Sequence, residues 1–241
     1  MVENIFLSLI IPTYNEETNI SDTLADVSGY LADKNFNYEV IVSDDGSKDA
    51  TIKVVEGIKE KPRNLKIIRS EKNRGKGHAL RSAVDAAVGE HIMFMDADSA
   101  VSISELDKFI PILTDNTDIY IASRRIPGAK LSMPANRNML GKIYICLANI
   151  LLGINVNDIN CGFKVFKREA AKKVFSRQIM NDWSFDAELI FLSTKYGYKI
   201  GEVPIEWVYK DTSKVRPLRD GIKSFISLLK IRANDLRGKY D

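Results

Sequence analysis

The first half of the chain alternates between short apolar runs and longer stretches in which apolar residues recur at helical spacing. A short run rich in β-branched residues is typical of a buried strand, and the helical spacing is typical of an amphipathic helix. This pattern predicts strands over residues 5–11, 38–42, 65–68, 92–95 and 119–122, and helices over residues 16–31, 49–59, 77–88 and 102–113. Strands joined by helices of this length form a mostly parallel central sheet with helices on both faces.

Individual residues mark the ends of these elements. Pro12 is expected to end the first strand, because proline has no N–H to give to a sheet. Asp49 and Ser102 are expected to cap the helices that follow them. Glu105 follows Ser102 at the spacing of a capping box, which strengthens the prediction of an α-helix there.

The second half of the chain is less regular. It predicts a helix over residues 134–152, a strand over 162–166, helices over 168–175 and 186–196, a strand over 200–207 and a final amphipathic helix over 218–233. No repeat or long linker divides the chain. The simplest organisation is therefore one compact domain over residues 1–212 followed by a C-terminal appendage over residues 213–241.

The appendage is basic and amphipathic. Ile222, Phe225, Ile226 and Leu229 recur on one face of its predicted helix, and lysine and arginine residues flank that face. Two interpretations stay open: the helix packs on the protein's own core, or it lies in a membrane interface. The helix predicted over residues 134–152 is open to the same two interpretations.

Composition limits the partners and the compartment. A net charge of +3 over 241 residues gives no global indication of nucleic-acid binding. Cys146 and Cys161 fit neither a metal-site spacing nor a disulfide framework, which indicates a reducing, cytoplasmic setting. The N-terminal apolar run lacks the features of a signal peptide, and the apolar residues 143–154 are too few to span a membrane. We therefore expect a protein that lies on the cytoplasmic face of a membrane without crossing it.

Polar side chains follow three of the predicted strands at the point where each strand ends. They are Tyr14, Asn15 and Glu16 after the first, Asp44 and Asp45 after the second, and Asp96 and Asp98 after the fourth. The carboxyl ends of parallel strands meet at one edge of a sheet, where ligands of such folds bind. Several carboxylates at one edge repel one another unless a cation lies between them. A divalent metal bound to a nucleotide diphosphate would supply that cation, since Mg²⁺ takes one or two carboxylates together with phosphate oxygens.

Seven motifs carry a resemblance to a known family. PTYNEE at residues 12–17, SDDGSKDAT at 43–51, NRGKGHAL at 73–80 and DADSA at 96–100 are similar to the signature of family 2 glycosyltransferases of the A-type fold. SR at residues 123–124, DINCGFK at 158–164 and WSFDAE at 183–188 resemble the dolichyl-phosphate glucosyltransferase branch, which is related to dolichol-phosphate mannose synthases. The resemblance covers residues 5–215, and it makes residues 1–212 the catalytic domain.

The resemblance implies roles for individual residues. The nucleotide sugar would be held by Pro12, Tyr14, Glu16, Val42, Asp44, Lys76, Asp96 and Ala97. Mg²⁺ or Mn²⁺ would be held by Asp96 and Asp98, and the acceptor phosphate would be held by Arg124, Arg137 and Lys214. Arginine suits that task because its planar guanidinium binds phosphate through two parallel hydrogen bonds. The catalytic residues would be Asp98, Arg124 and Asp158, with Asp158 as a base or as the group that orients the acceptor.

Simpler roles stay open for some of these residues. Arg137 and Lys214 are equally explained as solvated surface charges, and Asp158 as a cap of a helix or loop. Asp186 and Glu188 stand two residues apart, so their side chains point in different directions on a helix. Only one of these two carboxylates is therefore expected to face the site.

The resemblance also implies the reaction. An oxygen of a polyprenyl (dolichyl-type) phosphate would attack the anomeric carbon of the donor sugar in one step, which inverts that centre. The mannose synthases continue Asp-x-Asp with Leu-Gln, whereas this chain has Ser99 and Ala100, which favours a UDP-sugar such as UDP-glucose. The alternatives are a GDP-mannose-dependent synthase, transfer to a saccharide hydroxyl, which needs a true base, and a nucleotide-sugar-binding module without catalysis.

Overall fold

The computed structural model describes residues 4–58, 61–132, 135–208 and 217–241. Its strands are β1 (Leu7–Thr13), β2 (Tyr38–Asp44), β3 (Leu65–Arg69), β4 (His91–Met95), β5 (Ile119–Ser123), β6 (Lys130–Ser132), β7 (Phe163–Lys167), β8 (Ile200–Pro204) and β9 (Glu206–Val208). Its α-helices are α1 (Ile20–Ala32), α2 (Thr51–Gly57), α3 (Lys76–Ala86), α4 (Ala135–Leu152), α5 (Arg168–Arg177), α6 (Phe185–Lys195) and α7 (Pro217–Leu236). The 3₁₀ helices η1 (Ile103–Lys108) and η2 (Ile110–Ile112) lie between β4 and β5.

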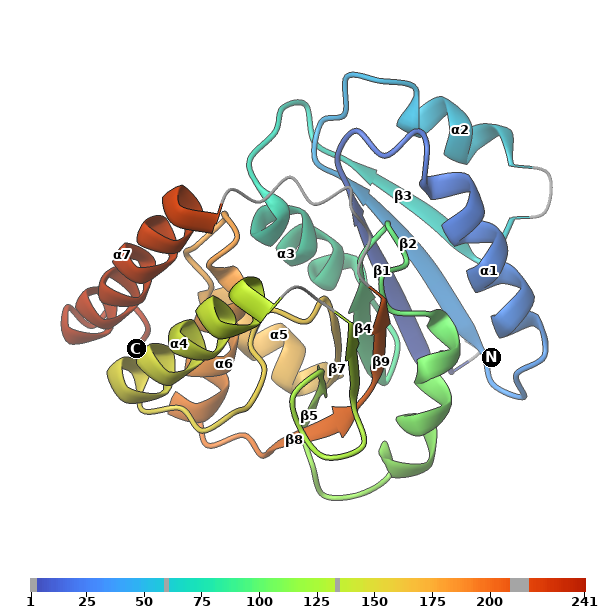
Figure 1. Ribbon diagram of the computed structural model, residues 1–241. Coiled ribbons are helices and arrows are strands. Elements are labelled where there is room, and N and C mark those ends of the chain that lie inside the picture. The colour runs from blue at the N-terminus through green and yellow to red at the C-terminus, as the bar shows by residue number, and fades with distance from the viewer. Residues whose placement is uncertain (1–3, 59–60, 133–134, 209–216) are drawn as a thin grey trace.

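A seven-stranded sheet forms the centre of the molecule, with the strand order β3-β2-β1-β4-β7-β5-β8 (Figure 1). Neighbouring strands are parallel except at β7, which is antiparallel to both β4 and β5. The short strands β6 and β9 pair with each other in a separate parallel sheet. The mostly parallel sheet predicted from the sequence is therefore confirmed, with one reversed strand inside it.

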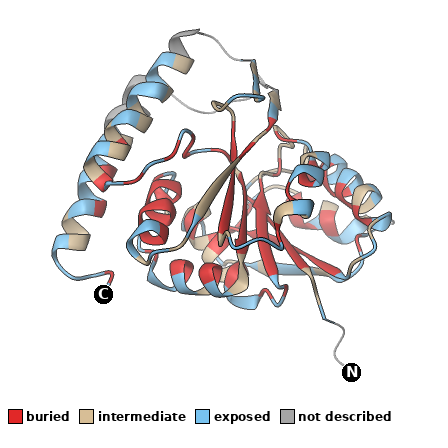
Figure 2. Ribbon diagram, turned by 90° about the horizontal axis from the view of Figure 1, so that it is seen from below, coloured by how far each residue is buried: buried red, intermediate tan, exposed pale blue. Residues whose placement is uncertain are grey.

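Different helices cover the two faces of the sheet. Ile20 and Leu24 of α1 are buried on one face together with Leu9 and Ile11 of β1. Ile10 points to the other face, because successive side chains of a strand alternate, and there it joins a core built with α3, α5 and α6. α4 and α7 contact each other on the flank of that second layer (Figure 1). Figure 2 shows the buried strands of the sheet between helices whose outer faces are exposed.

The single strand predicted over residues 200–207 is wrong, since the chain changes sheets within it. β8 and β9 are separated at Ile205, whose amide donates a hydrogen bond to the Ser123 carbonyl at 3.2 Å. The Ile205 carbonyl accepts a hydrogen bond from the Lys130 amide at 3.1 Å, so this residue joins the main sheet to the small one. The sequence did not predict β6, because a three-residue strand is too short to show alternation.

The predicted α-helix over residues 102–113 is also wrong, because this segment forms two 3₁₀ helices. Pro111 prevents an α-helix from continuing through the end of the segment, since a proline inside an α-helix removes one hydrogen bond and its ring clashes with the carbonyl of the preceding turn. Ser102 caps the segment as predicted, but its Oγ accepts a hydrogen bond from the Ser104 amide at 3.3 Å. A capping box would use the Glu105 amide instead.

Pro12 lies inside β1 and does not end it. β1 pairs with β2 as far as Thr13, but it pairs with β4 only as far as Ile10. Beyond Ile10 the β4 side of β1 has no strand partner in the described sheet. A residue without an N–H is tolerated at such a position because no ladder hydrogen bond is lost.

α7 buries one face and exposes another. Leu228 and Ile231 lie in the same core cluster as the inner helices. Phe225, Ile226 and Leu229, which belong to the predicted amphipathic face, are exposed. Core packing therefore uses a different stripe of the helix from the one that suggested a membrane interface.

Candidate active site

The residues that follow β1, β2 and β4 lie at one edge of the sheet, and we call this edge the carboxyl rim. β1 stands between β2 and β4 in the strand order, and Thr13 at its end pairs with Asp44 at the end of β2. Thr23 of α1 donates a hydrogen bond to the Ala97 carbonyl at 2.7 Å, which fastens the turn after β4 to the helix after β1. The polar clusters predicted to meet therefore belong to adjoining loops.

The loop after β1 is bound to the loop after β2. Asn15 has a φ of 54°, in the left-handed region that asparagine tolerates, and its amide donates to Ser47 Oγ at 2.9 Å. The Asn15 side-chain oxygen accepts from the Lys48 amide at 2.9 Å, and the Glu16 amide donates to Thr51 Oγ1 at 2.8 Å. The two loops are thus one connected unit of the rim.

Four of the residues predicted to hold the nucleotide sugar, on β1, on β2 and in the loop after β1, divide into two groups. Tyr14 is exposed, and Glu16 is partly exposed with its carboxylate accepting a hydrogen bond from Asn19 at 2.7 Å. Pro12 and Val42 are buried in the sheet, so their side chains serve its packing. Tyr14 and Glu16 are therefore the side chains of this group that a nucleotide at the rim can reach.

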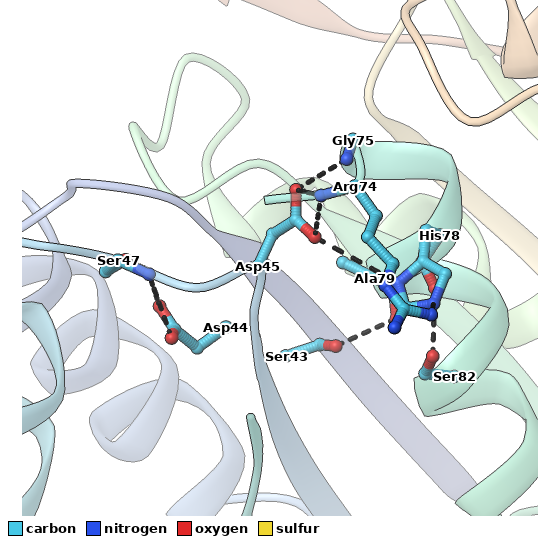
Figure 3. Close-up of polar contacts among 9 residues, drawn as sticks. All are labelled: Ser43, Asp44, Asp45, Ser47, Arg74, Gly75, His78, Ala79 and Ser82. Carbon is cyan, nitrogen blue, oxygen red and sulfur yellow. Dashed lines mark hydrogen bonds and ion pairs between the residues drawn. The ribbon is translucent and has the colours of Figure 1, made fainter. Parts of the chain in front are cut away.

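Asp44 is buried at the end of β2 (Figure 3). Its carboxylate accepts a hydrogen bond from the Ser47 amide at 3.1 Å, and Arg69 lies 3.7 Å away. Ser47 Oγ also accepts the hydrogen bond from the Asn15 amide. Asp44 therefore helps to fix the loop after β2, which is bound to the loop after β1. Its predicted role in holding the nucleotide sugar stays a prediction.

Asp45 has a different task, which the sequence did not indicate. Its carboxylate accepts hydrogen bonds from the amides of Arg74 at 3.0 Å and Gly75 at 2.7 Å, and the His78 ring lies 4.0 Å away (Figure 3). Arg74 and Gly75 belong to the segment 73–77, which leads into α3 and which we call the glycine loop, and His78 lies in the first turn of α3. Asp45 therefore fixes the loop that carries Lys76.

Lys76 joins the glycine loop to the end of β4 through an ion pair with Asp96. Burial works to lower the pKa of Lys76, but the carboxylates of Asp96, Asp186 and Asp98 outweigh it and raise the pKa above its ordinary value. The side chain is therefore charged at neutral pH. It supplies part of the positive charge that a rim lined with carboxylates requires.

Asp98 lies on a tight turn that follows Asp96. Ser99 has a φ of 50°, and the Ala100 amide donates to the Asp98 carboxylate at 3.0 Å. Ala97 between the two aspartates is buried, while Asp96 and Asp98 are both partly exposed. The turn thus presents its carboxylates at the rim and buries the residue between them.

The backbone before β7 packs directly on Asp96. A Cβ added to Gly162 would lie 2.1 Å from Oδ2 of Asp96, which is far closer than non-bonded atoms can approach. This contact arises because β7 is antiparallel to β4, so that Phe163 at its start pairs with Met95 at the end of β4. A larger residue at position 162 would therefore force the Asp96 carboxylate out of its present position.

Arg124 and Asp158 form a bidentate ion pair beside the rim. Nε and Nη2 of Arg124 donate to Asp158 at 2.7 and 2.9 Å, and the Arg124 amide donates to the same carboxylate at 3.1 Å. Burial works to raise the pKa of Asp158, but Arg124 outweighs it and holds the pKa below its ordinary value. A carboxylate with a lowered pKa is a weak proton acceptor, so the geometry favours the orienting role of Asp158 over the role of a base.

A second buried pair lies between β7 and α6. Lys164 contacts Asp186 at 2.5 Å and donates to the Cys161 carbonyl at 2.7 Å. Burial raises the pKa of Asp186, although Lys164 and Lys76 act to lower it. Glu188 instead accepts hydrogen bonds from the backbone before α6. The two carboxylates therefore point in different directions, as their spacing predicted, and Asp186 is the one near Lys76.

Asp96 and Asp98 fit a divalent metal that arrives with a nucleotide. Within the described ranges, no three His, Cys, Asp or Glu side chains come together as a metal-binding group. Mg²⁺ needs only one or two carboxylates when phosphate oxygens and water complete its shell. Two partly exposed carboxylates on one turn meet this requirement.

Some predicted residues cannot be placed. Lys214 lies outside the described residues, and so do the side chains of Arg137 and Ile222. The acceptor-phosphate site can therefore be described only through Arg124.

A family model described as "Glycosyl transferase family 2" matches residues 8–175, which include the carboxyl rim, the glycine loop and β7. The chain belongs to glycosyltransferase family 2. The carboxyl rim is therefore the candidate active site of a glycosyltransferase, and Lys76, Asp96 and Asp98 lie beside one another there.

This glycosyltransferase is similar over nearly its whole length to dolichyl-phosphate beta-glucosyltransferases. It is 31% identical to the protein from Dictyostelium discoideum, over 98% of this chain and 77% of the relative. It is 33% identical to the human protein, over 97% of this chain and 77% of the relative. The protein from Saccharomyces cerevisiae is 33% identical, over 99% of this chain and 77% of the relative. The branch of the family that the second half of the sequence indicated is thereby confirmed.

Solved structures share the fold of this glycosyltransferase. Glucosyl-3-phosphoglycerate synthase from Mycobacterium tuberculosis, in complex with uridine-diphosphate, superposes with a TM-score of 0.70 at 18% identity, over 95% of this chain and 80% of that chain. Mannosyl-3-phosphoglycerate synthase from Rubrobacter xylanophilus gives a TM-score of 0.65 at 17% identity, over 98% of this chain and 75% of that chain. At these identities the likeness concerns the fold alone.

Sequence reasoning missed residues that build this glycosyltransferase's site without facing the substrate. Asp45 and Gly162 lie inside the quoted motifs, yet neither received a role of its own. For Gly162 a signal was available, because a glycine next to a buried strand marks a point where another group approaches the backbone closely, here the Asp96 carboxylate. For Lys164 no signal existed, since a lysine inside a strand is normally exposed.

Proposed function

We propose that this glycosyltransferase transfers glucose from UDP-glucose to a dolichyl-type polyprenyl phosphate and inverts the anomeric centre. The observation that carries the proposal is the identity of 31–33% with dolichyl-phosphate beta-glucosyltransferases of distant organisms, over 97–99% of the chain. A match of this extent includes the carboxyl rim, the pair of Arg124 with Asp158 and the pair of Lys164 with Asp186.

The rim suits a nucleoside diphosphate sugar. Asp96 and Asp98 would hold Mg²⁺ or Mn²⁺ against the diphosphate, where the ion acts as a Lewis acid on the departing nucleotide. Lys76 is already held at Asp96 and adds a positive charge that needs no reorganisation as negative charge builds on the leaving group. Tyr14 and Glu16 are the exposed side chains proposed to contact the base and ribose.

Arg124 is proposed to bind the acceptor phosphate. Asp158 holds its guanidinium in one plane through two hydrogen bonds, and Arg124 also interacts electrostatically with Asp96. A phosphate bound at Arg124 would therefore lie beside the donor site. Arg124 acts here as the group that orients the nucleophile, and Asp158 as the residue that positions Arg124.

The proposed nucleophile needs no base. A phosphate monoester has a second pKa near ~6, so an acceptor phosphate is largely dianionic at neutral pH. Its oxygen forms the new bond to the anomeric carbon as the bond to the UDP oxygen breaks, and UDP leaves with the electron pair. The lowered pKa of Asp158 agrees with a reaction in which no proton has to be removed.

Attachment to the cytoplasmic face of a membrane is part of the proposal. In the described part of the chain, every helix is too short or too polar to cross a bilayer. The neighbouring helices α4 and α7 carry exposed apolar side chains: Met139, Leu140, Ile143, Ile150, Phe225, Ile226, Leu229 and Leu236. Lys223, Lys230 and Arg232 of α7 are also exposed. A surface that mixes apolar and basic side chains suits attachment to anionic lipid without insertion.

The experiment that tests the donor and the metal uses the whole protein. It is incubated with a short polyprenyl phosphate and labelled UDP-glucose, UDP-galactose or GDP-mannose, each with and without EDTA. We expect lipid-linked product from UDP-glucose, its loss in EDTA, and its recovery with added Mg²⁺ or Mn²⁺. Equal transfer from GDP-mannose would contradict the proposal that UDP-glucose is the donor. Transfer that EDTA does not affect would contradict the proposed dependence on a metal.

Asp158→Asn separates a phosphate acceptor from a saccharide hydroxyl acceptor. If Asp158 only positions Arg124, kcat should fall by less than about 100-fold, because a true general base contributes roughly 100-fold or more. The variant should also lose stability, since Arg124 keeps its charge in a site that no longer neutralises it. We would measure kcat well below the melting temperature of the variant. Complete loss of turnover in a folded Asp158→Asn protein would favour the hydroxyl acceptor.

A further inference from the structure

We infer that Tyr240 is a positioning residue of the active site, acting through Glu188 on the glycine loop that carries Lys76. The inference uses the proposed function only for the choice of UDP as a probe. Each of its steps is a contact between described residues, and together they link the C-terminal segment to the carboxyl rim.

The first contact buries the Tyr240 side chain in the core. After α7 the backbone turns at Gly238, which has a φ of 68°, and Tyr240 inserts into the cluster that covers one face of the sheet. Tyr240 is 0% exposed, and its ring centre lies 5.9 Å from that of Phe191 in α6. Its carbonyl accepts a hydrogen bond from the Tyr196 hydroxyl at 2.6 Å. The C-terminal segment is thus fastened to α6 at more than one point.

The second contact joins Tyr240 to a buried carboxylate. The Tyr240 hydroxyl donates to Oε1 of Glu188 at 2.6 Å, and Glu188 is 0% exposed. Oε2 of Glu188 accepts hydrogen bonds from the amides of Ile179 at 3.1 Å and Met180 at 2.8 Å. A buried carboxylate needs such donors to offset its lost hydration, so Tyr240 helps to hold Glu188 where it can bind these two amides.

The third contact passes from residues 178–181, which we call the anchor segment, to the glycine loop. The Asn181 carbonyl accepts a hydrogen bond from the Gly77 amide at 2.9 Å. A Cβ on Gly75 would lie 2.2 Å from the Asn181 oxygen, and a Cβ on Gly77 would lie 2.6 Å from the Met180 oxygen. Gly75 therefore allows backbone to pack on backbone, and Gly77 allows the Met180 carbonyl and the Gln178 side chain to approach the glycine loop closely. A shift of the anchor segment must move the glycine loop or break this contact.

The last contact reaches the rim. Lys76 stands between Gly75 and Gly77, and its ammonium group binds Asp96. The ring of Trp183, just beyond the anchor segment, lies 6.0 Å from the same ammonium group. The position of Lys76 therefore depends on the anchor segment on one side and on Asp96 on the other. Loss of the Tyr240 hydroxyl should loosen the donor site as well as the fold.

The test compares Tyr240→Phe with Tyr196→Phe. Both variants remove one hydroxyl that fastens the C-terminal segment to α6, but only Tyr240 contacts Glu188. Both are made in a Trp207→Phe background, which leaves Trp183 as the remaining tryptophan, since the chain has two. We would measure the fluorescence anisotropy of Trp183, the Kd for UDP with Mn²⁺, and the melting temperature.

We expect Tyr240→Phe to lower the Trp183 anisotropy and to raise the Kd for UDP by about fivefold or more, and Tyr196→Phe to change that Kd by less than about twofold. Glu188→Gln should stay close to wild type, because its amide group can still accept from the backbone and can donate to the Tyr240 oxygen. Glu188→Leu should lower the Trp183 anisotropy and raise the Kd for UDP at least as much as Tyr240→Phe does.

An unchanged anisotropy in Tyr240→Phe, or equal effects of the two tyrosine variants on anisotropy and Kd, would overturn the inference and leave Tyr240 as a packing residue. If the parent protein binds no UDP, the donor proposal fails separately. The anisotropy comparison then still decides whether Tyr240 holds the anchor segment.

Discussion

Asp98→Ala should lower kcat/KM for glucosyl transfer by about 1,000-fold while the protein stays folded. The reason is electrostatic, because removal of one preorganised group that stabilises developing charge costs roughly 100- to 1,000-fold. The fold should survive because Asp98 is partly exposed on a turn at the rim. Initial rates at saturating acceptor, together with circular dichroism and a melting curve, measure both parts of this expectation.

Asp26→Ala is the matched control for this variant. Asp26 is an exposed residue of α1, outside the loops that form the rim, and the same charge is removed. We expect its rates to equal those of the wild type. Full activity of Asp98→Ala would refute the role of this residue in binding the metal and the diphosphate, and equal losses in both variants would show a general effect of charge.

Gly162→Ala should lower kcat by about 100-fold, since a displacement of about 1 Å in a catalytic group can cost that much. The added methyl would overlap the Asp96 carboxylate, with its Cβ 2.1 Å from Oδ2, so Asp96 has to leave the position in which it binds Lys76. Overpacking of this kind also costs about 1–3 kcal/mol of stability. The measurement is kcat at a temperature where the variant is fully folded, with its melting temperature determined in parallel.

Gly29→Ala provides the contrast. Gly29 lies in α1 with nothing within 4 Å of its added Cβ, so alanine fits there without displacing another group. Alanine in a helix interior is more stable than glycine by about 0.5–1 kcal/mol. We expect unchanged kcat and a slightly higher melting temperature. A Gly162→Ala protein that keeps wild-type kcat would show that Asp96 tolerates displacement.

The first five strands could be predicted because each β-α unit leaves the same pattern of a short apolar run followed by helical spacing. The direction of β7 could not be predicted in this way, since a run such as Phe163–Lys167 looks the same whichever way it pairs. In the segment 102–113 the capping signal of Ser102 and Glu105 favours an α-helix, although Pro111 cannot lie in the interior of one. Local sequence patterns thus predicted most strands and helices. The direction of β7 depends instead on its pairing in the folded sheet, and the end of the segment 102–113 on a single proline.

The rim was predictable for a similar reason. Asp44, Asp96 and Asp98 follow strands directly, and parallel strands bring such residues to one edge. The contacts that hold the rim together join residues far apart in the sequence, as in the approach of Gly162 to Asp96 or the hydrogen bond of Tyr240 to Glu188. Neither contact leaves a periodic signal in the sequence, so only the folded structure reveals them.

The reversed strand β7 has a consequence for synthesis on the ribosome. All five residues of β4 are buried, and one of its two neighbours is β7, which the ribosome makes only after η1, β5 and α4. Until residues 163–167 emerge, one hydrogen-bonding edge of β4 is unpaired, and an unpaired edge of an apolar strand is a site of aggregation. We expect the nascent chain to need protection by a chaperone during this interval, and the need to end when β7 inserts and brings Gly162 against Asp96.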